Sequence, residues 1–261
     1  EREREIRAFK SHKFWVISAD VASSAGVPFT VICEDEPTNE KIVGDIVNKA
    51  EKGKWIVKDI KETAVKKSPR APFITSTLQQ TASSRLGFSP ARTMGIAQKL
   101  YESGLITYMR TDSTNLSQVA IAQIAQTVEK KYGKENLQIR TYAAKSKNAQ
   151  EAHEAIRPTH FNVEKAGHND EQKKLYELIW RRALSSQMKD ADTLRTKITA
   201  NIEGAGIPDF SATGTQVKSP GWLVADPASR GEDVELPKVK ASEALDLKKV
   251  NTEEKQTEPP P

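Results

Sequence analysis

The stretch Lys66-Lys67-Ser68-Pro69-Arg70-Ala71-Pro72 marks the place where this 261-residue chain changes character. Two prolines within a basic run are typical of a break between structural elements, because proline cannot donate the backbone hydrogen bond that a helix or strand needs. Strand-like segments precede the break and helix-like segments follow it. We therefore place a domain boundary after residue 70.

The residues before this break predict strands around one helix. Residues 14–17, 27–32 and 55–57 are rich in β-branched and aromatic side chains, which strands favour. Residues 22–26 form a turn-like gap between the first two. From residue 39 to residue 50 the apolar positions follow helical spacing, and Gly53 ends that element.

Residues 73–190 predict helices. Each predicted helix begins at a cap residue, and the first three end at a glycine. They run from Thr75 or Ser76 to Gly87, from Ser89-Pro90 to Gly104 and from Ser117 to Gly133, and a fourth helix begins at Asn169 or Asp170. Residues 105–108 predict a short strand after the second helix. Helix–turn–helix steps followed by a strand resemble the winged-helix layout of DNA-reading proteins.

The last third returns to strands. Residues 196–202 alternate between apolar and polar side chains, residues 221–224 predict a further strand after a turn, and the polar, proline-rich residues 253–261 predict an exposed terminus. The predicted fold class is therefore α+β and multidomain. A discontinuous β-rich domain, residues 1–70 and 196–261, is interrupted by a mostly α-helical, winged-helix-like domain, residues 71–195.

Composition limits the class of protein. The chain is 37% hydrophobic and 29% charged, and it has no apolar run near the ~20 residues of a membrane helix. Its single cysteine, Cys33, excludes an internal disulfide and indicates a reducing compartment. The first residue is glutamate, and the charged run that follows is no signal peptide, so we expect a piece of a longer protein.

The positive charge lies in the middle of the chain. The formal net charge is +5, and residues 71–195 carry 18 basic and 12 acidic side chains, a net of +6. Contact with a polyanion is expected to concentrate there. An ordinary solvated surface of mixed charge is the alternative explanation of so small an excess.

The densest polar cluster is Thr107-Tyr108-Met109-Arg110-Thr111-Asp112-Ser113. A phenol with a pKa near 10 is a weak nucleophile at neutral pH, but a neighbouring cation lowers that pKa and neutralises charge on phosphate oxygens. Tyr108 and Arg110 therefore suit phosphoryl transfer. Asp112 would hold Arg110 or cap the next helix; a turn with an ordinary salt bridge is the alternative.

Two further stretches offer polar groups. The stretch Glu151-Ala152-His153-Glu154-Ala155-Ile156-Arg157 suggests a zinc motif with histidine at its first and fifth positions, but with His153 as the first position the fifth is Arg157, so a metalloprotease site is excluded. His153 and Arg157, one turn apart on a helix, suit phosphate contact and proton transfer, or else only charge pairing. The hydroxyls and amides of residues 76–85 suit a nucleic-acid backbone, or the wet face of a helix.

Taken together, these stretches resemble type IA DNA topoisomerases, and the Tyr-Met-Arg variant resembles bacterial topoisomerase I. The resemblance covers roughly the whole chain. Its motifs match in order and spacing: Pro-Phe-Ile-Thr-Ser-Thr-Leu-Gln-Gln (72–80), Thr-Met (93–94), Ala-Gln-Lys-Leu-Tyr-Glu (97–102), Gly-Leu-Ile-Thr-Tyr-Met-Arg-Thr-Asp-Ser (104–113) and Glu-Ala-His-Glu-Ala-Ile-Arg-Pro-Thr (151–159).

The resemblance implies relaxation of negatively supercoiled DNA without ATP. Tyr108 would attack a phosphodiester of single-stranded DNA and form a 5′-phosphotyrosyl link; strand passage and religation follow. Arg110 would stabilise the transition state, and His153 would contact the scissile phosphate. The supporting or DNA-binding residues would be Thr107, Thr111, Asp112, Arg157, Gln98 and Glu102, the last two one helical turn apart.

The resemblance also implies parts that this sequence lacks. The family's Toprim domain, which holds Mg²⁺ through acidic ligands, has no match here, because Glu34-Asp35-Glu36 is better explained as surface. We expect no metal bound by this part, and no relaxation by it alone. Its β-rich domain would be the hinge of the family's movable arch. The expected partners are single-stranded or supercoiled DNA and the remaining domains of the same polypeptide, without a membrane, in the nucleoid-associated cytoplasm.

Other classes explain the residues less well. Tyrosine recombinases and type IB topoisomerases place arginine and His-x-x-Arg elements before a tyrosine near the C-terminus, whereas Tyr108 precedes His153 and Arg157. A non-enzymatic winged-helix module that binds single-stranded DNA would fit the basic middle of the chain but leaves the tyrosine cluster unexplained. A structural interaction module is the third alternative.

Overall fold

The computed structural model describes residues 2–142 and 153–259, and these form two compact units. The first unit comprises residues 1–65, 194–216 and 233–261, and the second comprises residues 66–193 and 217–232. The sequence placed residues 217–232 with the β-rich segments, so this part of the predicted division is wrong. Each unit has its own hydrophobic core.

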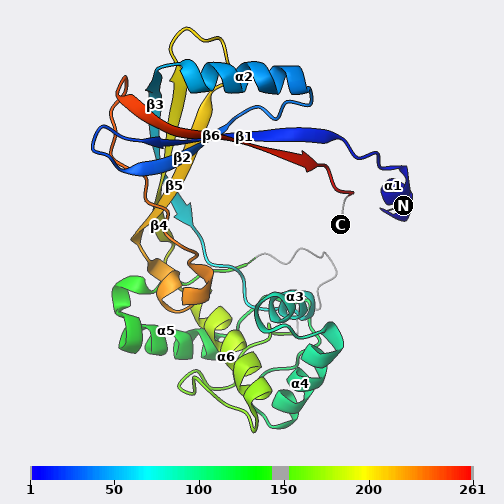
Figure 1. The fold of residues 1–261 in the computed structure, drawn as a ribbon. Helices are drawn as coiled ribbons and strands as arrows, with labels where there is room; N and C mark the ends of the chain where they lie inside the picture. Colours follow the sequence, from blue (N-terminus) through cyan, green and yellow to red (C-terminus); the bar gives the residue numbers. More distant parts are fainter. Residues whose placement is uncertain (1, 143–152, 260–261) are drawn as a thin grey trace. The chain divides into compact units, whose positions relative to one another are not determined.

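The first unit is built on a closed barrel (Figure 1), whose strands follow one another in the order β1-β2-β5-β4-β3-β6. Their bounds are β1 Lys13–Ala22, β2 Pro28–Cys33, β3 Trp55–Lys67, β4 Ala191–Ile202, β5 Phe210–Ser219 and β6 Ala244–Gln256. β1 pairs antiparallel with both β2 and β6. The polar residues 253–256, expected in an exposed terminus, thus belong to a strand that pairs with β1.

Alternation of side chains explains how this barrel fills. Along β1, Ile17, Ala19 and Val21 are fully buried, as the two-residue period of a strand requires. Inside, the rings of Trp55 and Phe210 meet edge to face with centroids 5.0 Å apart.

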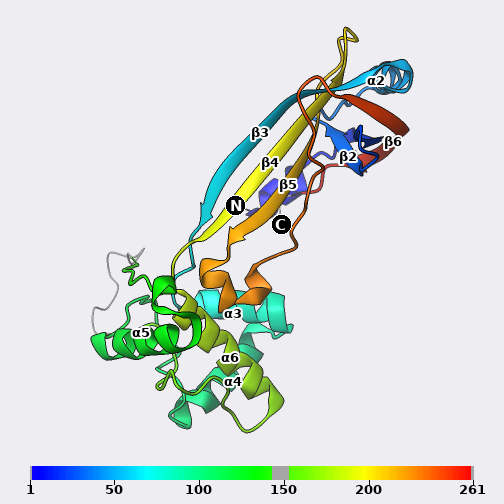
Figure 2. The same cartoon turned by 90° about the vertical axis from the view of Figure 1, so that its left-hand side faces the viewer.

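Two helices belong to the first unit, α1 (Arg2–Ala8) and α2 (Glu40–Lys52). α2 lies over one end of the barrel (Figures 1 and 2) and buries Val43, Ile46 and Ala50. It begins where the Asn39 side chain accepts a hydrogen bond from the amide of Lys41, so Asn39 caps it.

The second unit is helical (Figure 2), as the sequence predicted. Its α-helices are α3 Thr75–Leu86, α4 Pro90–Glu102, α5 Gln118–Tyr132 and α6 Asp170–Ser185, and a short 3₁₀ helix η1 spans Lys134–Asn136. The side chains of Ser89, Ser117 and Asn169 accept hydrogen bonds from the first turns of α4, α5 and α6. These three predicted caps are confirmed.

The segment 217–232 joins the helical unit through specific contacts. It contains the 3₁₀ helices η2 (Gly221–Val224) and η3 (Pro227–Ser229), so the strand predicted over residues 221–224 is wrong. The indole of Trp222 donates to the carbonyl of Lys67 at 2.7 Å. At Gly221, with φ +47°, a Cβ atom would lie 2.1 Å from the carbonyl oxygen of Asp190, so the backbones meet where only glycine fits.

Two other local predictions need correction. Residues 105–108 form no strand, and Ile106 makes a single bridge with Pro158. Residues 153–160 are not helical, while Glu151 and Ala152 lie outside the described residues. Within the described part of the helical unit we find isolated bridges and no hairpin between the helices, so a winged helix is not confirmed. None of the helices described is both long and apolar enough to cross a membrane.

Candidate active site

The segment that carries Tyr108 begins at the end of α4. Gly104 adopts φ +69°, a conformation that costs glycine little, and reverses the chain there. The amide of Gly104 donates to the carbonyl of Tyr101 at 2.8 Å, and that of Leu105 donates to Leu100 at 2.9 Å. The helix end therefore determines the direction in which residues 105–113 leave.

One side of this segment is held by residues 155–158. The amide of Thr107 donates to the carbonyl of Arg157 at 2.9 Å, and the Thr107 hydroxyl donates to the carbonyl of Ala155 at 2.7 Å. The same hydroxyl accepts from the amide of Arg157 at 2.9 Å. Thr107, predicted as a supporting residue, thus ties two distant parts of the chain together immediately before Tyr108.

The other side is held by the first residue of α3. The amide of Thr75 donates to the carbonyl of Thr111 at 3.0 Å, and the Thr75 hydroxyl accepts from the amide of Thr111 at 2.9 Å. That hydroxyl also lies 2.9 Å from the carbonyl oxygen of Met109, to which it can donate. Hydrogen bonds thus hold the backbone on both sides of Tyr108 and Arg110, and we call residues 107–111 the held segment.

Buried and exposed side chains alternate from residue 108 to residue 113. Met109, Thr111 and Ser113 are buried, whereas Tyr108, Arg110 and Asp112 are exposed. The phenol, the guanidinium and the carboxylate therefore leave the segment away from the core. The ring of Tyr101, from the last turn of α4, meets the Tyr108 ring edge to face with centroids 5.3 Å apart.

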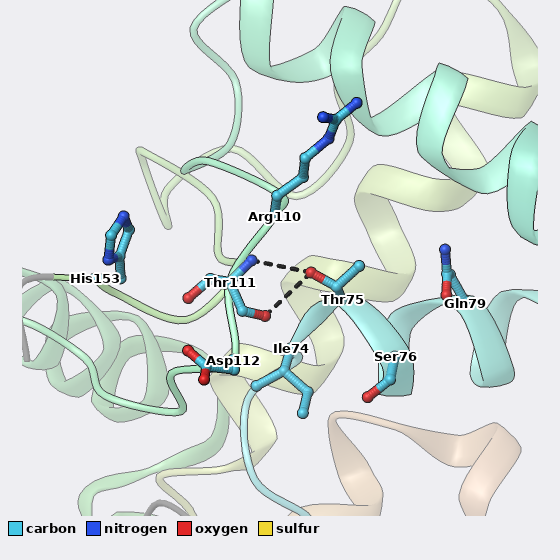
Figure 3. Close-up of a pocket in the computed structure, with 8 residues that line it drawn as sticks. All are labelled: Ile74, Thr75, Ser76, Gln79, Arg110, Thr111, Asp112 and His153. Carbon is cyan, nitrogen blue, oxygen red and sulfur yellow. Dashed lines mark hydrogen bonds between the residues drawn. The ribbon is translucent and has the colours of Figure 1, made fainter. Parts of the chain in front are cut away.

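A cavity of about 480 Å³ lies beside these side chains (Figure 3), a size that suits a small ligand or one unit of a polymer. Its lining residues come from three places in the sequence: α3 with the residue before it, residues 110–112, and residue 153. They are Ile74, Thr75, Ser76, Gln79, Arg110, Thr111, Asp112 and His153. The structure thus brings together Arg110, Thr111, Asp112 and His153, four of the residues predicted from the sequence. Tyr108 does not line the cavity.

Neither role expected for Asp112 is present. Among the described residues Asp112 forms no ion pair with Arg110, so the ordinary salt bridge suggested for this turn is absent there. Nor does Asp112 cap α5, which Ser117 caps. Both charged side chains line the cavity.

Arg157 has a structural role. Its side chain is only 12% exposed, and its guanidinium pairs with Glu154 and donates to the carbonyl of Pro158 at 2.9 Å. Burial raises the pKa of Glu154, but hydrogen bonds from Ser117 and the charge of Arg157 outweigh burial and hold that pKa below its usual value. Arg157 therefore supports the 153–158 stretch and does not line the cavity.

Gln98 and Glu102, predicted as supporting or DNA-binding residues, do not line this cavity, and their role stays a prediction. Gln98 donates to the Glu102 carboxylate at 2.8 Å along the surface of α4. Ser76 and Gln79 of α3 were predicted only as part of the polar stretch 76–85, and Tyr101 was not predicted as a site residue. The polar side chains of residues 76–85 indicated a surface for a nucleic-acid backbone. Their helical spacing did not show which of them line a cavity with Arg110.

A metal site is not formed by the described residues. They contain no group of three or more histidine, cysteine, aspartate or glutamate side chains that could hold an ion. Among the described residues that line the cavity, Asp112 alone has a carboxylate, which supplies far fewer oxygen ligands than Mg²⁺ takes. The described residues of this cavity therefore do not fit Mg²⁺.

The chain matches known proteins along its whole length. A family model described as DNA topoisomerase matches residues 1–261. DNA topoisomerase 1 of Pseudomonas aeruginosa is 40% identical over 272 residues, and that of Escherichia coli K12 is 40% identical over 273; each match covers 100% of this chain and 31% of the relative. Full-length topoisomerase I from Thermotoga maritima superposes with a TM-score of 0.80 at 32% identity, covering 100% of this chain and 43% of that one. The chain thus spans about a third of the length of the Pseudomonas and Escherichia relatives and less than half of the Thermotoga protein.

Proposed function

Because this chain belongs to the bacterial DNA topoisomerase I family, we propose that it supplies the strand-cleaving tyrosine of a type IA enzyme, Tyr108. The observation that carries the proposal is the held segment from residue 107 to residue 111. Hydrogen bonds on both sides fix its backbone, and Tyr108 and Arg110 leave it toward solvent. Preorganised side chains of this kind lower the cost of reaching a transition state.

The proposed reaction exchanges one phosphodiester for another. The Tyr108 oxygen bonds to phosphorus as its proton leaves, and the bond from phosphorus to the 3′-oxygen breaks. The 3′-oxygen takes up a proton, and the 5′-phosphate stays on Tyr108. Religation reverses each step, so the cycle needs no ATP. Arg110 neutralises charge on the phosphate oxygens, and His153, across the same cavity, contacts the phosphate or moves a proton.

The rest of the cycle requires more than the residues described. We propose that the β-barrel unit is the hinge of a movable arch and that the helical unit carries the nucleophile. Further domains of the polypeptide would supply Mg²⁺ and the remaining DNA contacts, consistent with the greater length of the relatives. The substrate would be single-stranded or negatively supercoiled DNA of the nucleoid. The 261-residue chain by itself is expected not to relax supercoiled DNA.

A chimera tests the proposal. Residues 1–261 replace the matching region of the Escherichia coli relative, and a labelled single-stranded oligonucleotide is added with Mg²⁺ before denaturation. We expect a covalent adduct that maps to Tyr108 and is absent from Tyr108→Phe. Tyr101→Phe is the matched control, because Tyr101 is 41% exposed, Tyr108 is 40% exposed and their rings touch.

Two outcomes would overturn the proposal. An adduct that persists in Tyr108→Phe would assign the nucleophile elsewhere. A wild-type chimera that binds the oligonucleotide but forms no adduct would favour the alternative function, a non-enzymatic module that binds single-stranded DNA.

A further inference from the structure

Ser76 and Gln79 line the same cavity as Arg110 and His153. They lie three residues apart on α3, so they share one helix face. The neighbouring threonines are occupied: Thr75 bonds to residues 109 and 111, and Thr77 accepts from the amide of Ile74 at 3.1 Å. In the part of the chain that the structure describes, no hydrogen bond holds the side chain of Ser76 or Gln79.

The cavity has two chemically different sides. In Figure 3 the Thr75–Thr111 hydrogen bonds lie between His153 and Asp112 on one side and Ser76 and Gln79 on the other. Arg110 supplies a cation, whereas Ser76 and Gln79 supply a neutral hydroxyl and a neutral amide. Such neutral donors contact the sugar–phosphate backbone of nucleic acid whatever its sequence. Asp112 repels phosphate, which favours placing the backbone along α3.

Building on the proposed function, we propose that Ser76 and Gln79 hold the DNA strand that becomes attached to Tyr108, at its first nucleotides on the 3′ side of the break. Cleavage leaves the 5′-phosphate on Tyr108, so this strand alone is bound covalently to the helical unit. Only the attached strand must move with that unit when the break opens. A surface next to Arg110 that binds the sugar–phosphate backbone would restrict rotation of the attached strand about its single phosphotyrosyl bond.

A short oligonucleotide with a 5′-phosphate imitates the attached end. We would measure its binding to the 261-residue chain by fluorescence anisotropy at low salt, with the dye at the 3′ end, beside the same oligonucleotide with a 5′-hydroxyl. The chain is expected to prefer the 5′-phosphate, and Arg110→Ala to remove that preference. Gln79→Ala and Ser76→Ala are each expected to weaken binding of the 5′-phosphorylated strand about three- to tenfold, the loss of one hydrogen bond.

Gln80→Ala is the matched control. Gln80 is the next residue of α3, has the same side chain, is exposed and does not line the cavity, so binding should stay within about twofold. Gln79→Glu separates a contact from a structural role, since it keeps the length of the side chain but places a negative charge against phosphate. It should weaken binding more than Gln79→Ala does.

The outcomes separate this inference from the proposed function. If Arg110→Ala removes the 5′-phosphate preference but Gln79→Ala and Gln79→Glu bind like Gln80→Ala, the inference fails and the proposed function stands. A wild-type chain that binds neither oligonucleotide, or that binds both equally, counts against both.

Discussion

At the scale of single residues, the site depends on hydroxyl groups that bond to the backbone of a distant segment. Thr107 joins the Tyr108 segment to residues 155 and 157, and Thr75 joins α3 to residues 109 and 111 of that segment. Neither threonine performs chemistry in the proposed reaction. Residues 105–113 contain no helix or strand, so these hydroxyls provide hydrogen bonds that the backbone of a neighbouring strand would provide in a sheet.

Thr75→Val tests the value of one such hydroxyl. Valine has nearly the same shape, but it leaves the amide of Thr111 and the carbonyl of Met109 without this partner, so we expect a loss of about 1–3 kcal/mol in the free energy of unfolding. Urea denaturation measures the loss. Ser76→Ala, one residue further along α3, serves as control and should change stability by less than about 0.5 kcal/mol. Equal losses in the two variants would mean that the hydroxyl does not hold the segment.

Glu154 predicts how stability depends on pH. Burial opposes its ionisation, but Ser117 and Arg157 hold its folded-state pKa below the ordinary value of about 4.3, so its ionised form favours the folded state. This contribution is complete above the unfolded-state pKa and disappears as the pH falls through the lower folded-state pKa.

Denaturation of the wild type and of Glu154→Gln across pH 7 to 3 measures this effect. The wild type should be the more stable protein at pH 7, and the difference should shrink toward pH 3. A difference that does not depend on pH would show that the charge of Glu154 is not responsible.

At the scale of elements, the helix ends determine where the Tyr108 segment begins and ends. Gly104 turns the chain out of α4, and Ser117 starts α5 after the segment ends. The Arg182 guanidinium of α6 lies 4.2 Å from the centroid of the Phe73 ring, and burial lowers the pKa of Arg182 to about 10, which leaves it charged at neutral pH. The carbonyl of Phe73 in turn accepts from the amide of Ile156 at 2.9 Å.

Two glycines of this region should respond to alanine in opposite directions. Gly104→Ala forces an L-residue into φ +69° and should cost about 1–2 kcal/mol, although its Cβ would meet no atom within 4 Å. Gly95→Ala lies inside α4, also in open space, and should stabilise by about 0.5–1 kcal/mol. Thermal denaturation distinguishes them. The same sign of change in both variants would contradict the role given to the helix end.

At the scale of the whole molecule, the chain has two hydrophobic cores that share no residue. Ile17 is fully buried in the barrel core, and Leu100 is fully buried in the helical core. We therefore expect the two units to open locally as separate cooperative regions.

Hydrogen exchange read by mass spectrometry tests this separation. Ile17→Ala should cost about 2–5 kcal/mol and lower protection in the barrel unit, while protection of α3 to α6 stays near its wild-type level. Leu100→Ala should do the reverse. Equal loss of protection throughout the chain in either variant would show a single cooperative unit.

The sequence determined what depends on near neighbours along the chain. The caps Ser89, Ser117 and Asn169 and the strand-like run beginning at residue 14 could be predicted because capping and periodicity involve residues a few positions apart. The cluster Thr107 to Ser113 was recognised for the same reason: its groups are adjacent in the sequence.

The tertiary structure decided what depends on distant partners. Closure of the barrel, the place of residues 217–232 in the helical unit and the 3₁₀ turn at Gly221 all follow from packing against segments remote in sequence. Packing of distant segments also explains why Ser76 and Gln79 line the cavity and why Gln98 and Glu102 do not. Helical spacing shows which residues share a face, but only the packed chain determines what that face meets.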